Sequence, residues 1–350
     1  MAMPGRISLL NSQGKQYSPL NTSLQRRKHL AVQDLLRQLR DLLAEPFAHS
    51  AISPLRFRLA FRLTTMRRMS ESPFHLLEKT VVIVGVGLIG GSLAAALRSR
   101  RLAQTIIGVG RDFARLEQAR ESGLIDESST DIAAAAARAD LIVFCTPVDR
   151  VADGVREAAP YVRPGTLVTD VGSVKQPICD ALEDVPSFVG SHPIAGSHRQ
   201  GFEAADAHLF EGRTCVVTPL PSSDPALVHR VERLWQAVGM RTVQMSPAAH
   251  DQALAMTSHL PHVVAAALAA TLTEANQPLT GSGFRGTTRI AAGDPDLWTS
   301  ILLQNAEHVL GGIEAVQHQL EAYRQALATR NGPQIKRLLS EGRQRLKSNE

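Results

Sequence analysis

Two chemically versatile side chains, Ser173 and Lys175, follow a predicted buried strand at 166–170, in the segment Asp-Val-Gly-Ser-Val-Lys. Ligands of an open α/β sheet bind outside the carboxyl ends of its strands. A serine hydroxyl and a lysine ammonium at that edge could therefore contact the same ligand. Ser173 could equally be the N-cap of the following helix, and that role does not exclude the first.

A histidine stands directly before a proline in the segment Gly-Ser-His-Pro-Ile-Ala-Gly at 190–196, after a predicted strand at 187–190. Backbone that precedes a proline avoids the helical region, so we expect His192 in an extended turn with a well-defined ring position. Imidazole titrates near neutral pH and commonly takes the proton of an alcohol while hydride leaves the same carbon. We predict His192 as a catalytic base, with a purely structural histidine as the alternative.

Further histidines lie in the second half of the chain, next to an aspartate at 250–251 and in the segment Ser-His-Leu-Pro-His at 258–262. His259 and His262 are three residues apart, so they share one face of a helix and could be metal ligands. No carboxylate or thiolate nearby completes a ligand set. Hydrogen bonding to a substrate or within the fold is the favoured role for both, and no metal is predicted.

Two arginines, Arg285 and Arg289, stand four residues apart among Gly, Thr and Ala in the segment 283–291. A guanidinium in an apolar context is costly unless it meets an anion. A carboxylate-bearing substrate is the natural partner. A structural salt bridge is the alternative for at least one of the two.

A glycine motif predicts where a dinucleotide binds. The β-branched run at 81–84 is typical of a strand buried on both faces, and Gly85, Gly87 and Gly90 follow at GxGxxG spacing before a helix that starts near Leu88. Such glycines allow the tight turn, the approach of the pyrophosphate and the close packing of helix on strand, while the helix N-terminus offers free N–H groups. A glycine-rich turn of another α/β domain is the alternative, and the flanking strand and helix disfavour it.

The end of the second predicted strand, at 105–110, bears on the choice of cofactor. NAD-preferring sites place an acid there to accept hydrogen bonds from the ribose 2′-hydroxyl. Here the position falls near Gly110, with Arg111 next. Glycine leaves room for a 2′-phosphate and a guanidinium could pair with it, which favours NADP over NAD. In the alternative, Arg111 stacks on the adenine and Asp112 serves the ribose.

The order of predicted elements defines the fold class. Alternating strands and helices from residue 80 predict an α/β, Rossmann-type, doubly wound parallel sheet with an added edge, and an all-α dimerisation domain follows. Strands are expected at 80–85, 105–110, 141–146, 166–170, 187–190, 214–218 and 241–245. Helices are expected at 88–100, 112–122, 131–138, 149–158, 175–182, 225–238, 248–276, 295–329 and 333–347. The predicted domains are a basic, disordered N-terminal extension (1–74), a dinucleotide-binding domain (75–245) and a helical substrate and dimerisation domain (246–347).

Charge and composition exclude several classes of function. Residues 1–70 carry 12 Lys and Arg against 3 Asp and Glu, whereas the remaining residues carry 26 against 30, so the overall charge of +5 arises from the N-terminal segment. The predicted body is mildly acidic and aromatic residues make up only 4%, which argues against nucleic-acid binding. The three cysteines form no CxxC pair and no run of 18 apolar residues occurs, which favours a cytoplasmic protein without a membrane span.

The N-terminal segment admits three interpretations. It is rich in arginine and poor in acids, as organelle transit peptides are, and it could also be a flexible arm for an acidic surface. An amphipathic helix is plausible at 32–43. We favour the third interpretation, in which much of 1–70 is absent from the working protein, because Met66 and Met69 stand just before the first strand.

Taken together, the motifs resemble the prephenate/arogenate dehydrogenase family of tyrosine biosynthesis. The resemblance runs from about residue 79 to 343 and rests on the order of its segments more than on any one of them. Trp298 and Asn305 follow where the family pattern has them. The segments are the glycine-rich loop, Cys-Thr-Pro (145–147), Asp-Val-Gly-Ser-Val-Lys (170–175), Ser-His-Pro-Ile-Ala-Gly (191–196), Ser-His-Leu-Pro-His (258–262) and Gly-Phe-Arg-Gly-Thr-Thr-Arg-Ile-Ala (283–291).

The resemblance implies oxidative decarboxylation of a cyclohexadienyl ring by a homodimer that uses NADP or NAD. His192 matches the catalytic histidine and Ser173 the serine that holds the same ring hydroxyl. The implied substrate-binding residues are Arg289, which grips a carboxylate, His259, His262, His198 and Lys175. The implied cofactor-binding residues are Gly85, Gly87, Leu88, Ile89, Gly90, Arg111, Thr146 and Pro147.

One departure affects the choice of substrate. Many prephenate-using members carry an acid where this chain has His198, so both prephenate and arogenate stay open. Two rival functions are a β-hydroxyacid dehydrogenase, which needs a lysine that the segment 246–330 lacks, and a non-catalytic NADP(H)-binding module. The second leaves His192, Ser173 and Arg289 unexplained.

Overall fold

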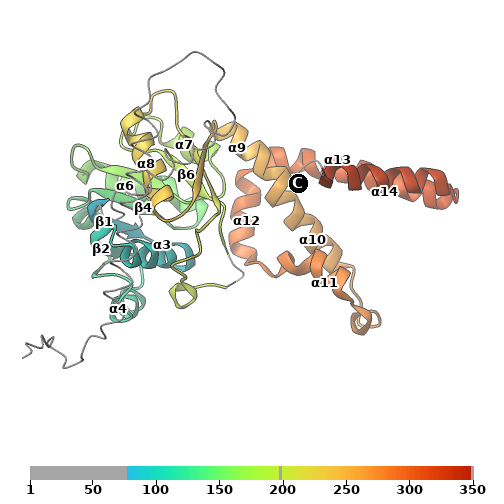
Figure 1. Cartoon of the computed structure of the whole chain (residues 1–350), viewed down its shortest axis with the longest axis horizontal. Helices are drawn as coiled ribbons and strands as arrows, with labels where there is room; N and C mark the ends of the chain where they lie inside the picture. The colour runs from blue at the N-terminus through green and yellow to red at the C-terminus, as the bar shows by residue number, and fades with distance from the viewer. Residues whose placement is uncertain (1–76, 197–198, 348–350) are drawn as a thin grey trace, which may run out of the picture. The chain divides into compact units, whose positions relative to one another are not determined.

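The computed structural model describes residues 77–196 and 199–347, so the expected N-terminal extension and its helix at 32–43 lie outside the described residues. The described chain begins with a five-stranded sheet in which every neighbouring pair is parallel (Figure 1). In spatial order its strands are β3 (Glu127–Ser129), β2 (Ala103–Val109), β1 (Glu78–Val84), β4 (Leu141–Phe144) and β5 (Leu167–Asp170). The predicted parallel sheet is confirmed, and β3, which was not predicted, is a three-residue edge strand without an apolar run.

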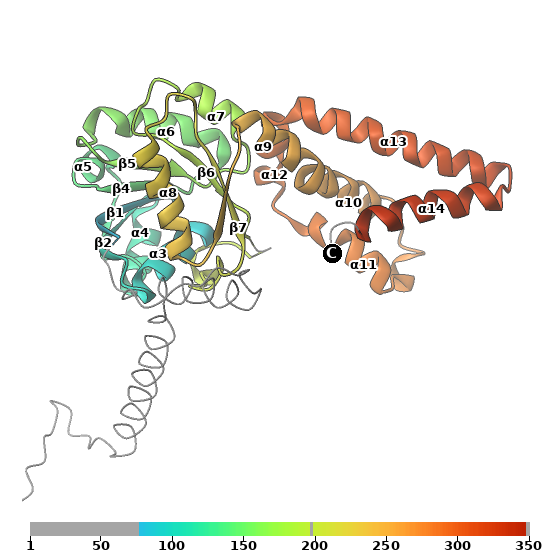
Figure 2. The same cartoon turned by 45° about the horizontal axis from the view of Figure 1, so that its top comes forward.

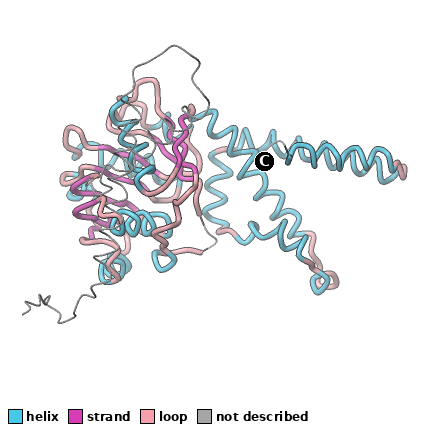
Figure 3. Tube along the Cα trace, viewed as in Figure 1, coloured by secondary structure: helices cyan, strands magenta, loops and turns pink. Residues whose placement is uncertain are grey.

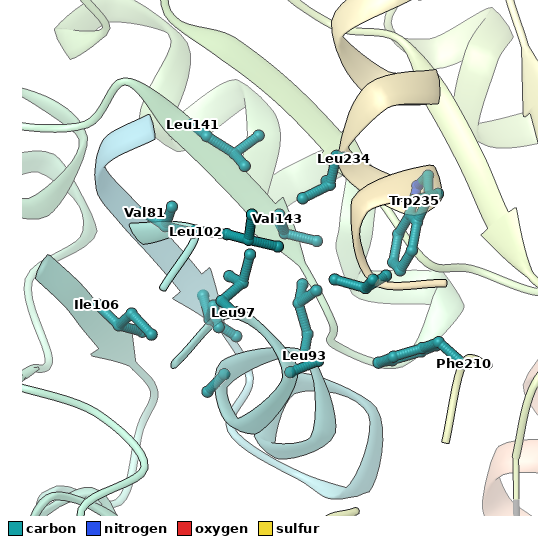
Figure 4. Close-up of a cluster of buried hydrophobic side chains, with 14 of the residues drawn as sticks. Val81, Leu93, Leu97, Leu102, Ile106, Leu141, Val143, Phe210, Leu234 and Trp235 are labelled. Atoms are coloured by element: carbon teal, nitrogen blue, oxygen red, sulfur yellow. The ribbon is translucent and has the colours of Figure 1, made fainter. Parts of the chain in front are cut away.

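Alternate residues of the central strand feed two hydrophobic clusters, one on each face of the sheet. Val81 and Ile83 belong to the cluster that also contains Leu93 and Trp235 (Figure 4), whereas Val82 and its neighbours pack on the opposite face. Both faces are therefore covered, which explains why β1 is a continuous run of β-branched residues. The covering helices are α3 (Leu88–Ser99), α4 (Phe113–Glu121), α5 (Ile132–Ala136), α6 (Val151–Ala158), α7 (Gln176–Ala181) and α8 (Pro225–Ala237).

The expected added edge is wrong, because the later strands form a sheet of their own. β6 (Gly190–Pro193), β7 (Thr214–Thr218) and β8 (Arg241–Gln244) make a three-stranded sheet in which β6 and β7 are antiparallel. A single parallel bridge, from Val168 to Phe188, links the chain before β6 to β5. Strand β6 begins where the predicted strand at 187–190 was expected to end. His192 and Pro193 are consequently part of a strand rather than of a turn beyond it.

Between residues 247 and 347 the described chain is mostly helical (Figure 3), as predicted, but the expected helix at 248–276 already ends at Ala270 and loops separate the later helices. The expected helix at 248–276 contains one π-helical turn, Ala255–His259, and the expected helix at 295–329 breaks at Asn305. Helices α13 and α14 are joined by a short turn and contact each other (Figure 2). The helices are α9 (Pro247–Leu254), α10 (Leu260–Ala270), α11 (Ser282–Thr288), α12 (Pro295–Gln304), α13 (Ala306–Ala328) and α14 (Gly332–Lys347).

The helical region leaves large apolar side chains exposed. Leu303, Leu310, Leu320 and Leu327 are each at least 59% exposed. The continuous helical stretch Pro247–Ala270 is apolar and long enough to cross a membrane, with only 28% of its most apolar window buried. Core helices of soluble proteins pass the same test of length and composition. The exposed apolar side chains of this stretch could therefore be buried against another protein surface as well as in a bilayer.

Candidate active site

The glycine loop after β1 has the geometry that dinucleotide binding requires. Gly85 has a φ of +94°, and a Cβ there would lie 2.8 Å from the Cys145 carbonyl oxygen. A Cβ on Gly90 would overlap the Gly85 carbonyl oxygen. A Cβ on Gly87 would meet nothing within 4 Å, so packing within the protein does not require glycine there. The open space in front of Gly87 is where the motif brings the pyrophosphate.

Free polar groups surround this loop. Helix α3 has no side-chain cap on its first N–H groups, and the buried Thr146 hydroxyl has no hydrogen-bond partner among the described residues. Gly85 lies against the Cys145–Thr146 peptide, so the chain brings these two predicted cofactor segments together. Leu88 and Ile89 are half-buried in the first turn of α3, and Pro147 precedes the short helix Val148–Arg150. Their roles stay predictions.

A hollow of about 450 Å³ lies beyond the end of β2, where the sequence predicts recognition of the ribose. Arg111 is exposed and has no ion pair among the described residues. Asp112 caps helix α4, its carboxylate accepting the Arg115 N–H at 3.1 Å. Arg115 itself is paired with Glu203 at 2.9 Å. The lining residues are Val86, Gly110, Arg111, Asp112, Arg115 and Leu116.

A chain of three hydrogen-bonded side chains links the sheet region to the first helix of the helical region. The Nδ1 of His192, in β6, lies 2.9 Å from the Nε2 of His250 in α9. The Nδ1 of His250 lies 2.7 Å from a carboxylate oxygen of Asp251. All three residues are buried, with His192 8% exposed. The candidate base, His192, is therefore held by His250, which is 58 positions away in the sequence and is itself bonded to Asp251.

Asp251 also holds the loop that carries Ser173. Its carboxylate accepts the backbone N–H groups of Lys175 at 2.7 Å and Gln176 at 2.8 Å, at the start of α7. The Asp251 carboxylate thus accepts the N–H groups that an N-cap side chain would otherwise accept. The alternative that Ser173 caps this helix is wrong, because α7 begins at Gln176, three residues after Ser173. The half-buried Ser173 side chain makes no hydrogen bond within the described part of the chain and is available to a ligand.

Lys175 does not meet the expectation of a substrate-binding residue. Its side chain is fully buried and forms an ion pair with Asp170, which is equally buried. Its ammonium also donates to the Ser191 carbonyl at 3.1 Å, and Asp170 accepts the Ser191 N–H at 3.1 Å. An ammonium enclosed in this way joins β5 to β6 and cannot contact a ligand that arrives from solvent.

The predicted pair His259 and His262 lies at the junction of the π-helical turn Ala255–His259 and α10, and both rings contact Trp298. The His262 ring stacks on the indole at 3.4 Å with an interplanar angle of 18°, and the His259 ring meets it edge-on at 6.2 Å. The Nε2 atoms of both histidines are buried and have no hydrogen-bond partner among the described residues. Nδ1 of His259 lies 3.0 Å from the side-chain nitrogen of Asn305, the residue at the break between α12 and α13.

The arginines are less enclosed than the sequence suggested. Arg285 and Arg289 are both exposed, on α11 and on the short helix Arg289–Ala292, and neither has an ion pair with another described residue. The alternative of a structural salt bridge thus has no support among the described residues, and no hydrogen bond between described residues joins Arg289 to His192. Gly293, directly after this helix, lies against the stack of His262 and Trp298. His198 lies outside the described residues.

Burial keeps the histidines of the site neutral. It lowers the pKa of His192 well below the ordinary value, and the nearby His250 and Lys175 lower it further. Burial also lowers the pKa of His250, although the hydrogen bond to Asp251 acts in the opposite direction. The pKa of His259 falls to about 4 and that of His262 is lowered, again because both rings are withdrawn from water. At neutral pH, His192 can therefore accept a proton.

Sequence reasoning found most of these residues but not how they are connected. It noted His250, Asp251, Trp298 and Asn305 without giving them a role, because only the fold brings them to His192 and His259. The adjacency of His250 and Asp251 was the available signal. Among residues 77–196 and 199–347, no three His, Cys, Asp or Glu side chains are grouped as a metal site.

With this geometry in view, known proteins provide a comparison. Residues 93–244 match the family model described as the nucleotide-binding domain of prephenate dehydrogenase, and residues 246–341 match the model of its dimerization domain. The chain belongs to the prephenate dehydrogenase family. The resemblance predicted from the motifs is confirmed, and it places the chain among oxidoreductases that use a nicotinamide cofactor.

Three relatives show the extent of the similarity. A prephenate dehydrogenase of Bacillus subtilis is 35% identical over 67% of this chain and 66% of its own length, just under two thirds. The crystal structure of prephenate dehydrogenase from A. aeolicus in complex with hydroxyphenyl propionate and NAD+ has a TM-score of 0.72 and 33% identity, covering 77% of this chain and 98% of that one. A Synechocystis arogenate dehydrogenase has a TM-score of 0.67 and 32% identity, covering 77% of this chain and all of that one, 100%.

Two glycine substitutions should separate folding from cofactor binding. Gly90→Ala places a methyl group against the Gly85 carbonyl, so we expect the free energy of unfolding to fall by about 1–3 kcal/mol. Gly87→Ala adds a methyl group in open space, so stability should change little while the affinity for NAD(P) falls. Urea unfolding and cofactor titration by fluorescence measure both. Equal loss of stability in the two variants would contradict this account of the loop.

The stability of the folded protein should already fall in mild acid, at pH values where carboxylates are still ionised. The four site histidines have folded-state pKa values below the unfolded value of about 6.5, so the unfolded chain binds protons that the folded chain does not. The free energy of unfolding should therefore fall as the pH drops from 6.5 toward 5, by at most about 1.4 kcal/mol per pH unit for each histidine. Urea titrations at several pH values measure this slope. His192→Asn should reduce it, and a stability that stays constant over this range would refute the assignment.

Proposed function

We propose that this protein catalyses the oxidative decarboxylation of prephenate to 4-hydroxyphenylpyruvate with NAD(P)+. The observation that carries the proposal is the buried, neutral His192, hydrogen-bonded to His250 and Asp251. The same aspartate anchors the loop that presents the free Ser173 hydroxyl. A neutral base and a hydroxyl donor held by one carboxylate suit the binding and deprotonation of an alcohol.

In the proposed reaction His192 accepts the proton of the ring hydroxyl, which Ser173 helps to orient. The glycine loop after β1 would hold NAD(P)+, which would supply the acceptor for the hydride on the carbon that bears this hydroxyl. Carbon dioxide then leaves from the opposite ring carbon, the ring becomes aromatic, and the proton returns to the phenolate oxygen. Aromatisation drives the reaction, so the protein must supply mainly alignment and one base. Arg289, exposed and free of ion pairs among the described residues, is suited to a substrate carboxylate.

Arogenate is the alternative substrate, which would yield tyrosine directly. Two observations keep it in the proposal: relatives of both kinds are similar to this chain, and His198 replaces the acid common in prephenate-using members. An imidazole instead of a carboxylate at this position of the family motif would change the charge available to the amino group of arogenate. A non-catalytic module that only binds NADP(H) is the remaining alternative.

We propose NADP as the slightly preferred cofactor. The carboxylate of Asp112 is engaged as a helix cap, whereas Arg111 is exposed beside Gly110 at the hollow after β2. These features support pairing of the guanidinium with a 2′-phosphate.

We also propose a homodimer in the cytoplasm. The exposed leucines of α12 and α13 and the apolar stretch Pro247–Ala270 offer a surface that a second copy can cover, and the matching family domain is described as a dimerization domain. An organelle is the alternative location if the basic N-terminal segment is a transit peptide.

A spectrophotometric assay that crosses prephenate and arogenate with NAD+ and NADP+ tests the proposed reaction. The wild type should reduce the cofactor in a substrate-dependent manner, and His192→Asn should lower kcat by about 10²–10⁴-fold because the general base is lost. Cofactor affinity should be nearly unchanged. His229→Asn, an exposed histidine elsewhere, serves as the matched control. Cofactor binding without turnover of either substrate would leave only the binding-module alternative.

Replacement of Arg111 tests the cofactor preference. Arg111→Gln should weaken NADP+ binding by about 10- to 100-fold, as expected for the loss of a charged hydrogen-bonding partner, and leave NAD+ binding unchanged. Arg120→Gln is the control, because it removes a positive charge from α4, the helix that follows Arg111, where Arg120 pairs with Glu117 at 2.7 Å. An equal effect of Arg111→Gln on both cofactors would contradict the proposed contact.

A further inference from the structure

The hydrogen bonds around His192 determine which of its nitrogens carries the proton. A carboxylate can only accept, so the 2.7 Å contact with Asp251 requires that His250 donates through Nδ1–H. Neutral His250 then has a bare Nε2, which must accept the proton on Nδ1 of His192 across 2.9 Å. Neutral His192 is left with an unprotonated Nε2.

The same reasoning gives the opposite result for His259. The side-chain nitrogen of Asn305 lies 2.8 Å from the Asp251 backbone carbonyl, which fixes the orientation of the amide because the carbonyl can only accept. That nitrogen therefore also donates to Nδ1 of His259 at 3.0 Å. The amide oxygen accepts from Nδ1 of His308 at 3.0 Å, which agrees with this orientation. Neutral His259 then carries its proton on Nε2.

We propose that Asp251 is a positioning residue that sets opposite tautomers in the two histidines. Through its carboxylate and His250, it leaves Nε2 of His192 as a hydrogen-bond acceptor. Through its backbone carbonyl and Asn305, it leaves Nε2 of His259 as a donor. In the proposed function, on which this interpretation rests, His192 would take a proton and His259 would stabilise a developing negative charge on oxygen.

The surroundings of the two rings support this assignment. Nε2 of His259 is buried without a partner among the described residues, and the Ser173 backbone acts to raise the pKa of this ring against the effect of burial. A donor at this position therefore faces the loop on which the substrate hydroxyl is expected. The charged groups that act on His250 are Asp251, Lys175 and Asp170, and burial outweighs the attraction of the two carboxylates. Lys175 and the rings of His250 and His259 act on His192, and all of them lower its pKa. A protonated His250 would reverse the first tautomer.

The tautomers can be read directly by long-range ¹H–¹⁵N correlation NMR of the full-length protein labelled with ¹⁵N-histidine, at neutral pH and without ligands. We expect a protonated Nδ1 and a bare Nε2 for His192, and the reverse for His259. His192→Asn and His259→Asn assign the signals by their disappearance. A proton on Nε2 of His192, or on Nδ1 of His259, would overturn the proposal. Because no turnover is needed, this result does not depend on the proposed reaction.

Asn305→Asp tests the branch to His259. A carboxyl group offers at most one proton, so it cannot donate to both the Asp251 carbonyl and His259, and the proton of His259 should move to Nδ1 while His192 stays unchanged. Gln304→Glu adds the same charge one residue earlier and should leave both tautomers as they are. In the assay, kcat of Asn305→Asp should fall by about 10²-fold with the KM for NAD(P)+ unaltered. An unchanged His259 tautomer in a folded Asn305→Asp protein would refute the role of Asn305, and if the variant does not fold, the wild-type spectrum still decides.

Discussion

The buried carboxylate of Asp251 is the contact on which the site depends. A buried charge is tolerated only when donors surround it, and here the donors come from two regions of the chain: the backbone at the start of α7 and the ring of His250. The loop after β5 and the first helix of the helical region are thereby joined at one point. Ser173 stands on the first of these and His192 contacts the second, so their relative position follows from this single group.

A second buried charge pair, Lys175 with Asp170, stabilises the sheet side of the site. It links the end of β5 to the beginning of β6, and together with Ser191 it forms a polar layer within otherwise apolar surroundings. Removal of either partner would leave an uncompensated charge in the core, which is far more costly than the loss of an exposed ion pair. The lysine serves the site indirectly, because it fixes the strand on which His192 stands.

The glycine loop predicted to bind the cofactor and the histidine cluster predicted to do the chemistry depend on different kinds of contact. The glycine loop works through backbone shape: Gly85 needs its positive φ and Gly90 needs the absence of a side chain, and both requirements arise within a few residues. The histidines work through long-range partners, since His192, His250 and His259 acquire their neutral state only when distant segments exclude water from them. The first kind of site can be predicted from a local sequence pattern, whereas for the second the sequence shows candidate histidines but not their partners.

The sequence by itself determined the parallel sheet, the glycine loop and the helical second half, and it marked His192 as a candidate base, because strand burial, turn geometry and the X-Pro backbone preference are local properties. Only the tertiary structure decided that β6 to β8 form a separate sheet, that Lys175 is enclosed and that Asp251 rather than Ser173 caps α7. It also decided that Asn305, at the break between two helices, meets His259. These outcomes depend on which distant groups share a buried volume, where every donor and charge needs a partner, and spacing along the chain does not reveal that.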